Sequence, residues 1–241
     1  MMIVTREGVR IYYYVQGEGE PLLLIRGYAN SAAMWYPQVP WLSAHFQVIT
    51  LDNRDTGNSD RVTVPYNIVD MAGDVIALIE HLNRGAVHLL GISMGGMIAQ
   101  QVTLLRPDLV KSIILGCTTC NHGTGLTTDP KVLELFAPLP ELSDEANVRR
   151  SLPVFFSPRT LKEKPDMIEE FIKINLAQRP PLETFVRHAQ AMKGFQVCDQ
   201  LNRITTPTLI QHGGGDLLIP FSNSEEIKKR MPQARLMIYE G

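Results

Sequence analysis

Ser93 lies in the most informative segment of the chain, the run G-I-S-M-G at residues 91–95. A short apolar run over residues 86–90 precedes this segment, and a longer helix-compatible run over residues 96–105 follows it. A strand, the pattern G-x-S-x-G and a helix, in this order, are typical of a nucleophile elbow, which is a strained turn that lifts a serine hydroxyl clear of a sheet. The two glycines favour such a turn because they let the helix approach the strand closely. The segment therefore predicts Ser93 as a nucleophile, with a plain glycine loop as the alternative.

The segment around Ser93 belongs to a longer alternation of apolar and amphipathic runs. The continuous apolar run at residues 22–25 is typical of a strand that is buried on both faces, and we expect further strands at residues 46–51 and 112–115. Residues 70–83 carry apolar side chains at helical spacing. Strands that alternate with helices predict a mostly parallel sheet with helices on both faces.

The alternation stops between about residues 118 and 203, where helical stretches prevail. The clearest helical patterns are those of residues 166–176 and 182–192, and no run in this part has the pattern of a buried strand. We therefore predict a helical cap inserted into the sheet-forming core. The strands resume at residues 208–211, and residues 236–239 form the last strand that the sequence indicates.

Three further segments resemble the α/β-hydrolase superfamily, in order along the chain. Residues 22–28, L-L-L-I-R-G-Y, resemble the strand and oxyanion turn, although Arg26 stands where many members carry histidine. Residues 48–59 are similar to the D-x-R-x-x-G-x-S turn of the superfamily. We interpret D-N-R-D at residues 52–55 as a turn held by an Arg–carboxylate contact rather than as a metal site. Residues 211–220 resemble the H-G-x-x-D-x-x-x-P segment that carries the catalytic acid.

Within the superfamily, residues 93–100 and 115–119 look most like small bacterial carboxylesterases and enol-lactonase-like proteins. The resemblance implies the α/β-hydrolase fold, with a mostly parallel sheet, helices on both faces and an inserted helical cap. The expected organisation is a first part of the hydrolase core at residues 1–117, a helical cap at 118–203, and a second, C-terminally incomplete part of the core at 204–241.

The resemblance also implies roles for individual residues. A serine hydroxyl is a poor nucleophile at neutral pH, so it needs a base and an acid that orients the base. Asp216 lies in a glycine-rich loop after a strand, which is the position of this acid in the superfamily. The alternative role for Asp216 is that of a helix N-cap or an Asx-turn. The backbone amides of Tyr28 and Met94 are the expected oxyanion donors, and Arg26 leaves the shape of the turn open.

The catalytic histidine of the superfamily follows the last strand, usually in a Gly-His pair. All histidines of this sequence precede Asp216: His45, His81, His88, His122, His188 and His212. We therefore expect the catalytic histidine beyond residue 241, and we expect the 241-residue chain to be inactive as a hydrolase. His122 is the alternative base, because it follows the strand at residues 112–115 and could border the cleft.

The composition restricts the partners that we expect. A net charge of −2 gives no electrostatic reason to expect binding to nucleic acid or to an anionic membrane. The N-terminus lacks the apolar run of a signal peptide, and no stretch approaches the roughly 20 apolar residues that span a membrane. Three cysteines do not make a disulfide framework, so we interpret Cys117 and Cys120 as ordinary thiols and expect a cytoplasmic protein.

These observations favour a serine hydrolase that cleaves a small carboxylic ester or lactone through an acyl-enzyme intermediate, with no cofactor and no metal. The cap would shape the pocket for the small-molecule substrate, and the sequence leaves the substrate and the oligomeric state open. A C–C bond hydrolase, a thioesterase or a perhydrolase would look nearly the same. The alternative from another class is a non-catalytic ligand-binding domain on a hydrolase scaffold.

Overall fold

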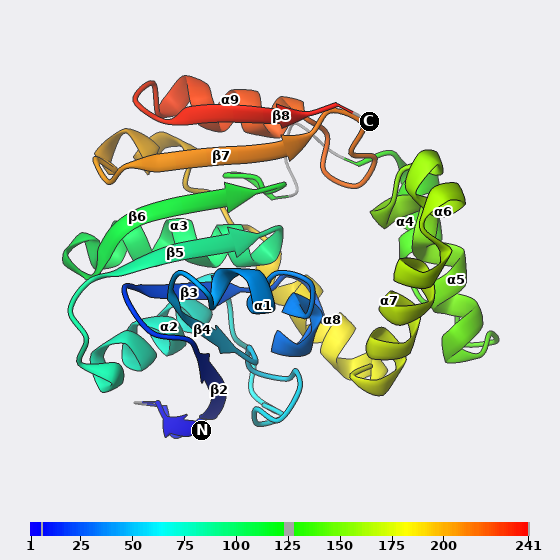
Figure 1. The fold of residues 1–241 in the computed structure, drawn as a ribbon, viewed down its shortest axis with the longest axis horizontal. Coiled ribbons are helices and arrows are strands. Elements are labelled where there is room, and N and C mark those ends of the chain that lie inside the picture. The colour runs from blue at the N-terminus through cyan, green and yellow to red at the C-terminus, as the bar shows by residue number, and fades with distance from the viewer. Residues whose placement is uncertain (6, 123–127, 241) are drawn as a thin grey trace.

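The computed structural model describes residues 1–5, 7–122 and 128–240, so that Gly241, at the end of the expected last strand, lies outside it. The strands of these residues form one eight-stranded sheet in the order β1-β2-β4-β3-β5-β6-β7-β8 (Figure 1). The strands are β1 (Met2–Val4), β2 (Arg10–Gln16), β3 (Pro21–Ile25), β4 (Gln47–Leu51), β5 (Val87–Ile92), β6 (Val110–Gly116), β7 (Thr208–Gly213) and β8 (Arg235–Tyr239). β1 and β2 pair antiparallel with their neighbours, and the pairs from β4 to β8 are parallel.

The central strands are covered on both faces, which is why their sequences are almost continuously apolar. Every residue of β3 is buried. The larger hydrophobic core lies between one face of the sheet and the helices α2 (Ile68–Leu82) and α3 (Met94–Leu105). A smaller cluster on the other face packs beneath the 3₁₀-helix η1 (Ala32–Trp35) and the helix α1 (Val39–Leu42). The α/β architecture predicted from the alternating pattern is confirmed.

Helices replace strands between β6 and β7 within the described residues. They are α4 (Pro130–Phe136), α5 (Asp144–Phe155), α6 (Pro158–Glu163), α7 (Pro165–Ala177), α8 (Leu182–Met192) and the 3₁₀-helix η3 (Cys198–Arg203). Helices α4 to α7 stand apart from the sheet, beyond the carboxyl ends of β5, β6 and β7, and α8 leads back toward it (Figure 1). Two further helices flank the remaining strands: η2 (Pro107–Leu109) and α9 (Ser222–Arg230). The division into core and cap at residues 118 and 203 stays a prediction.

A disulfide bond joins Cys120, just after β6, to Cys198, at the start of η3. The interpretation of Cys120 as an ordinary thiol is therefore wrong, because its partner is 78 residues away in the sequence. Cys117 remains a free cysteine. The bond ties together the two ends of the inserted helices, and closing a loop of that length stabilises a fold by about 4 kcal/mol.

Disulfide bonds persist mainly in oxidising compartments, so the cysteine count no longer supports the expected cytoplasmic location. In the described part of the chain, no helix is long and apolar enough to cross a membrane.

Candidate active site

Ser93 occupies a strained turn between β5 and α3. Its backbone angles are φ 54° and ψ −124°, which a non-glycine residue adopts only where the surrounding structure enforces them. A Cβ atom at Gly91 would lie 2.2 Å from the carbonyl oxygen of Gly95, and a Cβ atom at Gly95 would lie 2.2 Å from that of Ile25. The two glycines of the G-x-S-x-G pattern are therefore required by close backbone contacts, and a plain flexible loop is not what the sequence encodes there.

The turn after β3 lies directly against Ser93. A Cβ atom at Gly27 would be 3.0 Å from Ser93 Cβ and 3.4 Å from Ser93 Oγ. The Met94 amide is at the first position of α3, where an N–H has no acceptor within its own helix and the helix dipole favours a negative charge. Among the described residues, the amides of Tyr28 and Met94 donate no hydrogen bond. Their role as oxyanion donors stays a prediction.

Asp216 lies in the loop that follows β7. Its Oδ1 atom accepts hydrogen bonds from the amides of Leu218 at 2.9 Å and Ile219 at 2.8 Å. The Asx-type turn expected as the alternative is thus present, but it occupies only one carboxylate oxygen. The Oδ2 atom lies 3.5 Å from Nε2 of the buried His212, whose Nε2 donates to the Ile219 carbonyl at 2.8 Å. His212 supports the loop, and Oδ2 keeps capacity to accept a further hydrogen bond.

The Ser93 turn and the Asp216 loop are neighbours, because β6 lies between β5 and β7. The Ser93 amide donates to the Gly116 carbonyl at 2.9 Å, and the Cys117 amide donates to the Gln211 carbonyl at 2.9 Å. The Cys117 thiol is close enough to both loops that burial, followed by the negative charge of Asp216, raises the pKa of this thiol to about 11. A neutral thiol therefore lies between the candidate nucleophile and the candidate acid.

No histidine of the described residues makes a hydrogen bond with Ser93 Oγ. The alternative base, His122, is held through its backbone amide, which donates to the Phe195 carbonyl at 2.9 Å. Burial lowers the pKa of its imidazole. The structure does not bring His122 into contact with Ser93, and the assignment of the base stays a prediction.

A second serine, Ser112, does contact a histidine, at a different place in the fold. His88 Nδ1 lies 2.7 Å from Ser112 Oγ, and His88 Nε2 lies 2.8 Å from a carboxylate oxygen of Glu20. This set has the order of a catalytic triad, but Ser112 pairs with His88 between the neighbouring strands β5 and β6, next to a register shift at Val87 and His88. A serine there has no strained turn and no helix N-terminus beside it, so the contact holds two strands together. His88 is therefore a hydrogen-bonded residue of the sheet.

The buried imidazole of His188, on α8, braces the oxyanion turn. Its Nδ1 atom accepts a hydrogen bond from the Ala29 amide at 3.0 Å, and its Nε2 atom donates to the Arg54 carbonyl at 3.0 Å. Both bonds require a neutral ring, and burial lowers the pKa of His188 to about 4. No sequence pattern marked His188. A polar residue on the buried face of the amphipathic α8 was the only available signal.

The same helix holds the Asp55 turn. Arg187 donates to both carboxylate oxygens of Asp55, at 2.8 and 2.9 Å, and Thr184 Oγ1 donates to the Asp55 carbonyl at 3.1 Å. Arg54 in turn pairs with the buried Asp74 at 2.7 and 2.8 Å. The expectation that Arg–carboxylate contacts hold this turn is confirmed, and among the described residues no acidic, histidine or cysteine cluster is suited to a metal ion.

The Arg26 side chain packs on Trp35, and its charge opposes the rise in the pKa of the nearby Cys117 thiol. Its guanidinium lies 4.8 Å from the centroid of the Trp35 ring, and burial lowers the pKa of Arg26 to about 10. Its carbonyl accepts a hydrogen bond from Asn53 Nδ2 at 3.0 Å. The backbone of the turn is therefore fixed by Asn53 and His188, and the side chain at position 26 is not needed to hold it.

Lowering the pH is expected to destabilise the protein through His188. Because its folded pKa of about 4 is below the ordinary 6.5, the unfolded chain binds a proton that the folded chain excludes. The stabilising contribution is complete above pH 6.5 and is lost as the pH falls toward 4, with a maximum of about 3 kcal/mol. Urea unfolding at pH 7 and at pH 5 measures this loss.

The matched control for this measurement is His188→Gln. A glutamine amide can keep one acceptor and one donor at this position, but it does not titrate. The variant should therefore lose less stability between pH 7 and pH 5 than the parent protein. An identical loss in both proteins would show that His188 is not the responsible group.

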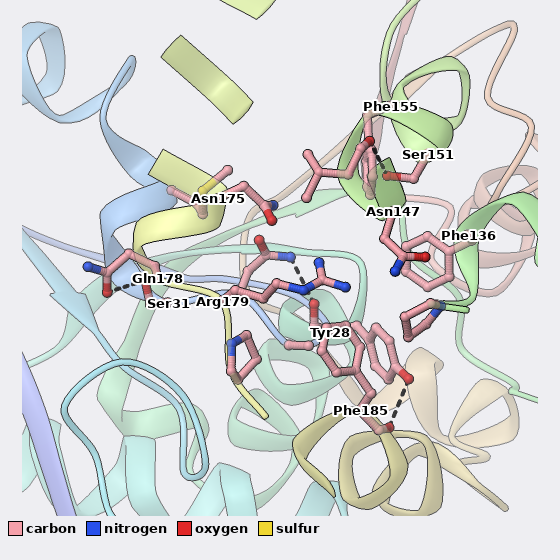
Figure 2. Close-up of a pocket in the computed structure, with 16 residues that line it drawn as sticks. Tyr28, Ser31, Phe136, Asn147, Ser151, Phe155, Asn175, Gln178, Arg179 and Phe185 are labelled. Atoms are coloured by element: carbon pink, nitrogen blue, oxygen red, sulfur yellow. Dashed lines mark hydrogen bonds between the residues drawn. The ribbon is translucent and has the colours of Figure 1, made fainter. Parts of the chain in front are cut away.

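A pocket lies beside the oxyanion turn (Figure 2). Its wall includes residues 28–31 of the turn, together with side chains from η1, α4, α5, α7 and α8. Tyr28 contributes its backbone to the turn and its ring to the pocket, and its hydroxyl donates to the Phe185 carbonyl at 2.8 Å (Figure 2). The pocket therefore borders the turn after β3, and Ser93 itself is not part of its wall.

Comparison with known proteins places this geometry in a family. The sequence pattern of the family described as "alpha/beta hydrolase fold" matches residues 20–241. The chain belongs to this family.

Three similar proteins are informative. The chain is 28% identical over 237 residues to RutD of Stutzerimonas stutzeri (strain A1501), which is named provisionally as a carbamate hydrolase. This match covers 95% of the chain and 87% of RutD. The structure of Est816, an N-acyl homoserine lactone degrading enzyme, is 26% identical with a TM-score of 0.80 and covers 98% of this chain and 91% of Est816. The enol-lactonase from Burkholderia xenovorans LB400 shares the fold, with 22% identity, a TM-score of 0.84 and coverage of 99% and 91%.

Proposed function

We propose that this α/β hydrolase is a serine hydrolase that cleaves a small carboxylic ester or lactone. The observation that carries the proposal is the strained Ser93 turn and the close packing of the turn after β3 against it. A Cβ atom at Gly27 would lie 3.0 Å from Ser93 Cβ and 3.4 Å from Ser93 Oγ. Strain of this kind costs about 1–3 kcal/mol, and its use here is to present a hydroxyl beside backbone amides. A ligand-binding domain would have no use for that arrangement.

The proposed reaction has two steps. Ser93 Oγ attacks the substrate carbonyl while its proton passes to a base, and the amides of Tyr28 and Met94 stabilise the oxyanion. The C–O bond to the alcohol then breaks, the alcohol takes the proton from the base, and an acyl-serine remains. Water attacks the acyl-serine in the same way and releases the acid. In a lactone, the alcohol and the acid belong to the same product.

We further propose that the base is a histidine carried by residues that follow residue 241. Asp216 would accept its Nδ1–H through Oδ2, since Oδ1 is occupied by the amides of Leu218 and Ile219. The relatives are longer than this chain, which covers 87% of RutD and 91% of Est816. Without such a histidine, the 241-residue chain would be inactive by itself.

A panel of three substrates tests the proposed reaction. We expect the protein with its C-terminal segment to hydrolyse p-nitrophenyl butyrate and δ-valerolactone with higher kcat/KM than p-nitrophenyl N-methylcarbamate. An ester carbonyl is more electrophilic than a carbamate carbonyl, so a site without a dedicated carbamate contact should prefer the ester. A preference for the carbamate would replace the ester hypothesis with the activity in the name of RutD. Binding without any turnover would favour the non-catalytic domain.

A further inference from the structure

The wall of the pocket beside the oxyanion turn contains one cationic side chain. Arg179 is the only charged residue in its wall, and neither an aspartate nor a glutamate of the described residues lines it. The other polar groups in the wall are neutral, and four of them are amides at Asn30, Asn147, Asn175 and Gln178. A concave site with one cation and several amides suits a ligand that carries a negative charge.

Arg179 points its guanidinium into this pocket (Figure 2). The side chain of Arg179 is only 14% exposed, and its guanidinium lies 5.5 Å from the centroid of the Phe185 ring. Its Nε atom pairs with Asp144 at 2.6 Å, but the Asp144 side chain is 70% exposed and lies outside the pocket wall. Within the described residues, the two Nη atoms make no hydrogen bond.

The remainder of the pocket is apolar. The rings of Tyr28, Phe136 and Phe155 line it (Figure 2), and Met34 of η1 is also part of its wall. The rings pack on one another, with centroids 5.5 Å apart for Tyr28 and Phe136 and 5.8 Å apart for Phe136 and Phe155. An apolar wall between the oxyanion turn and a guanidinium fits a hydrocarbon spacer between two polar groups.

We propose that the substrate carries a free carboxylate, which Arg179 binds while the scissile carbonyl lies against the oxyanion turn. The substrate class is thus a monoester of a dicarboxylic acid, or a lactone with a carboxylate side chain, and this inference rests on the proposed function. A guanidinium with two free Nη groups can hold a carboxylate through two parallel hydrogen bonds. The low exposure of Arg179 strengthens these bonds, because little water competes for them.

Arg26 is the other cation near the candidate nucleophile, and it is the competing anchor. Its Nε atom is buried without a hydrogen-bond partner in the described residues. Its guanidinium, however, lies against Trp35, on the face of the sheet that carries the smaller hydrophobic cluster, and Arg26 is not part of the pocket wall. The structure therefore favours Arg179, and Arg26 is tested alongside it.

The experiment measures binding, so that it does not depend on catalysis. The Ser93→Ala protein is titrated calorimetrically with the monomethyl and dimethyl esters of succinate, glutarate, adipate and suberate. We expect at least one monoester anion to bind about 10-fold to 100-fold more tightly than its neutral diester, as hydrogen bonds to a charged group allow. We expect Arg179→Gln to remove this preference.

Three control variants separate binding from folding. Asp144→Asn removes the acid partner of Arg179 but keeps the cation, so the preference for the monoester should persist or increase. Arg159→Gln removes an exposed arginine of α6, which pairs with Glu163, and should leave binding unchanged. Arg26→Gln should also retain the preference. Thermal unfolding of each variant shows whether it is folded before titration.

One outcome would identify Arg26 in place of Arg179 as the residue that binds the carboxylate, and two others would refute the proposal. Loss of the preference in Arg26→Gln, with retention in Arg179→Gln, would place the carboxylate at the other cation. Equal affinity for every monoester and diester in the Ser93→Ala protein would overturn the proposal. Loss in both Arg179→Gln and Asp144→Asn would show that the ion pair supports structure and does not bind ligand. None of these results depends on hydrolysis, so a failure of the proposed function remains distinguishable.

Discussion

A fluorophosphonate probe is expected to label Ser93 covalently in the protein that includes its catalytic histidine, and Ser93→Ala is expected to abolish this labelling. The same substitution should lower kcat for p-nitrophenyl butyrate by about a millionfold, because loss of a serine nucleophile has an effect of that order. The strained φ of 54° and the backbone contacts around the turn single out this serine for attack. Mass spectrometry of the labelled peptide and steady-state kinetics are the measurements.

Ser112 supplies the matched control for this experiment. It has a histidine neighbour, His88, at 2.7 Å and a carboxylate behind it, but it lies within strand β6, which is paired with β5. Ser112→Ala should therefore leave both labelling and turnover unchanged. Labelling of Ser112, or of any serine in the Ser93→Ala protein, would show that the elbow does not present the nucleophile.

A chain that continues past residue 241 with a Gly-His pair and a helix is expected to hydrolyse p-nitrophenyl butyrate about a millionfold faster than the 241-residue chain. Without the histidine, the Ser93 proton has no acceptor, and removal of the base of a triad alone has an effect of that order. The helix should also cover apolar side chains of β8, where Met237, Ile238 and Tyr239 are exposed. Hydrolysis and sedimentation of both chains under matched conditions measure the two effects.

Two substitutions sharpen the test of the base. In the longer chain, Asp216→Asn should lower kcat by about 10⁴-fold, because the imidazole then loses its orienting acceptor. His122→Ala should change kcat little in either chain. Full activity of the 241-residue chain that disappears in His122→Ala would place the base at His122. Full activity that survives every histidine substitution would refute the triad.

The sequence determined most of the fold, because the elements concerned are specified by neighbouring residues. The helix at residues 182–192 occurs with the predicted bounds, and the apolar run at residues 86–90 lies largely within the strand β5, Val87–Ile92. The apolar run of β3 is fully buried, and helical spacing located α2 to within two residues at each end. Hydrophobic periodicity determines such elements locally, so no knowledge of distant contacts was needed. β1 is too short for a periodic pattern, and the sequence did not indicate it.

The candidate nucleophile was also predictable from the sequence. Gly91 and Gly95 lie within two residues of Ser93, and the close contacts that require them follow from the path of the backbone at the turn. The segment around Asp216 likewise carries its own hydrogen-bond acceptors and donors within three residues. Local chemistry therefore marked both positions, while their roles in catalysis await the experiments above.

Only the tertiary structure decided which distant side chains support the site. The bonds of His188 span 159 residues to Ala29 and 134 residues to Arg54, and the Arg187–Asp55 pair spans 132 residues. The disulfide between Cys120 and Cys198, and the approach of Arg179 to the oxyanion turn, depend in the same way on how the inserted helices return to the sheet. A single sequence states which groups can form such contacts, but the packing of the hydrophobic faces selects the partners.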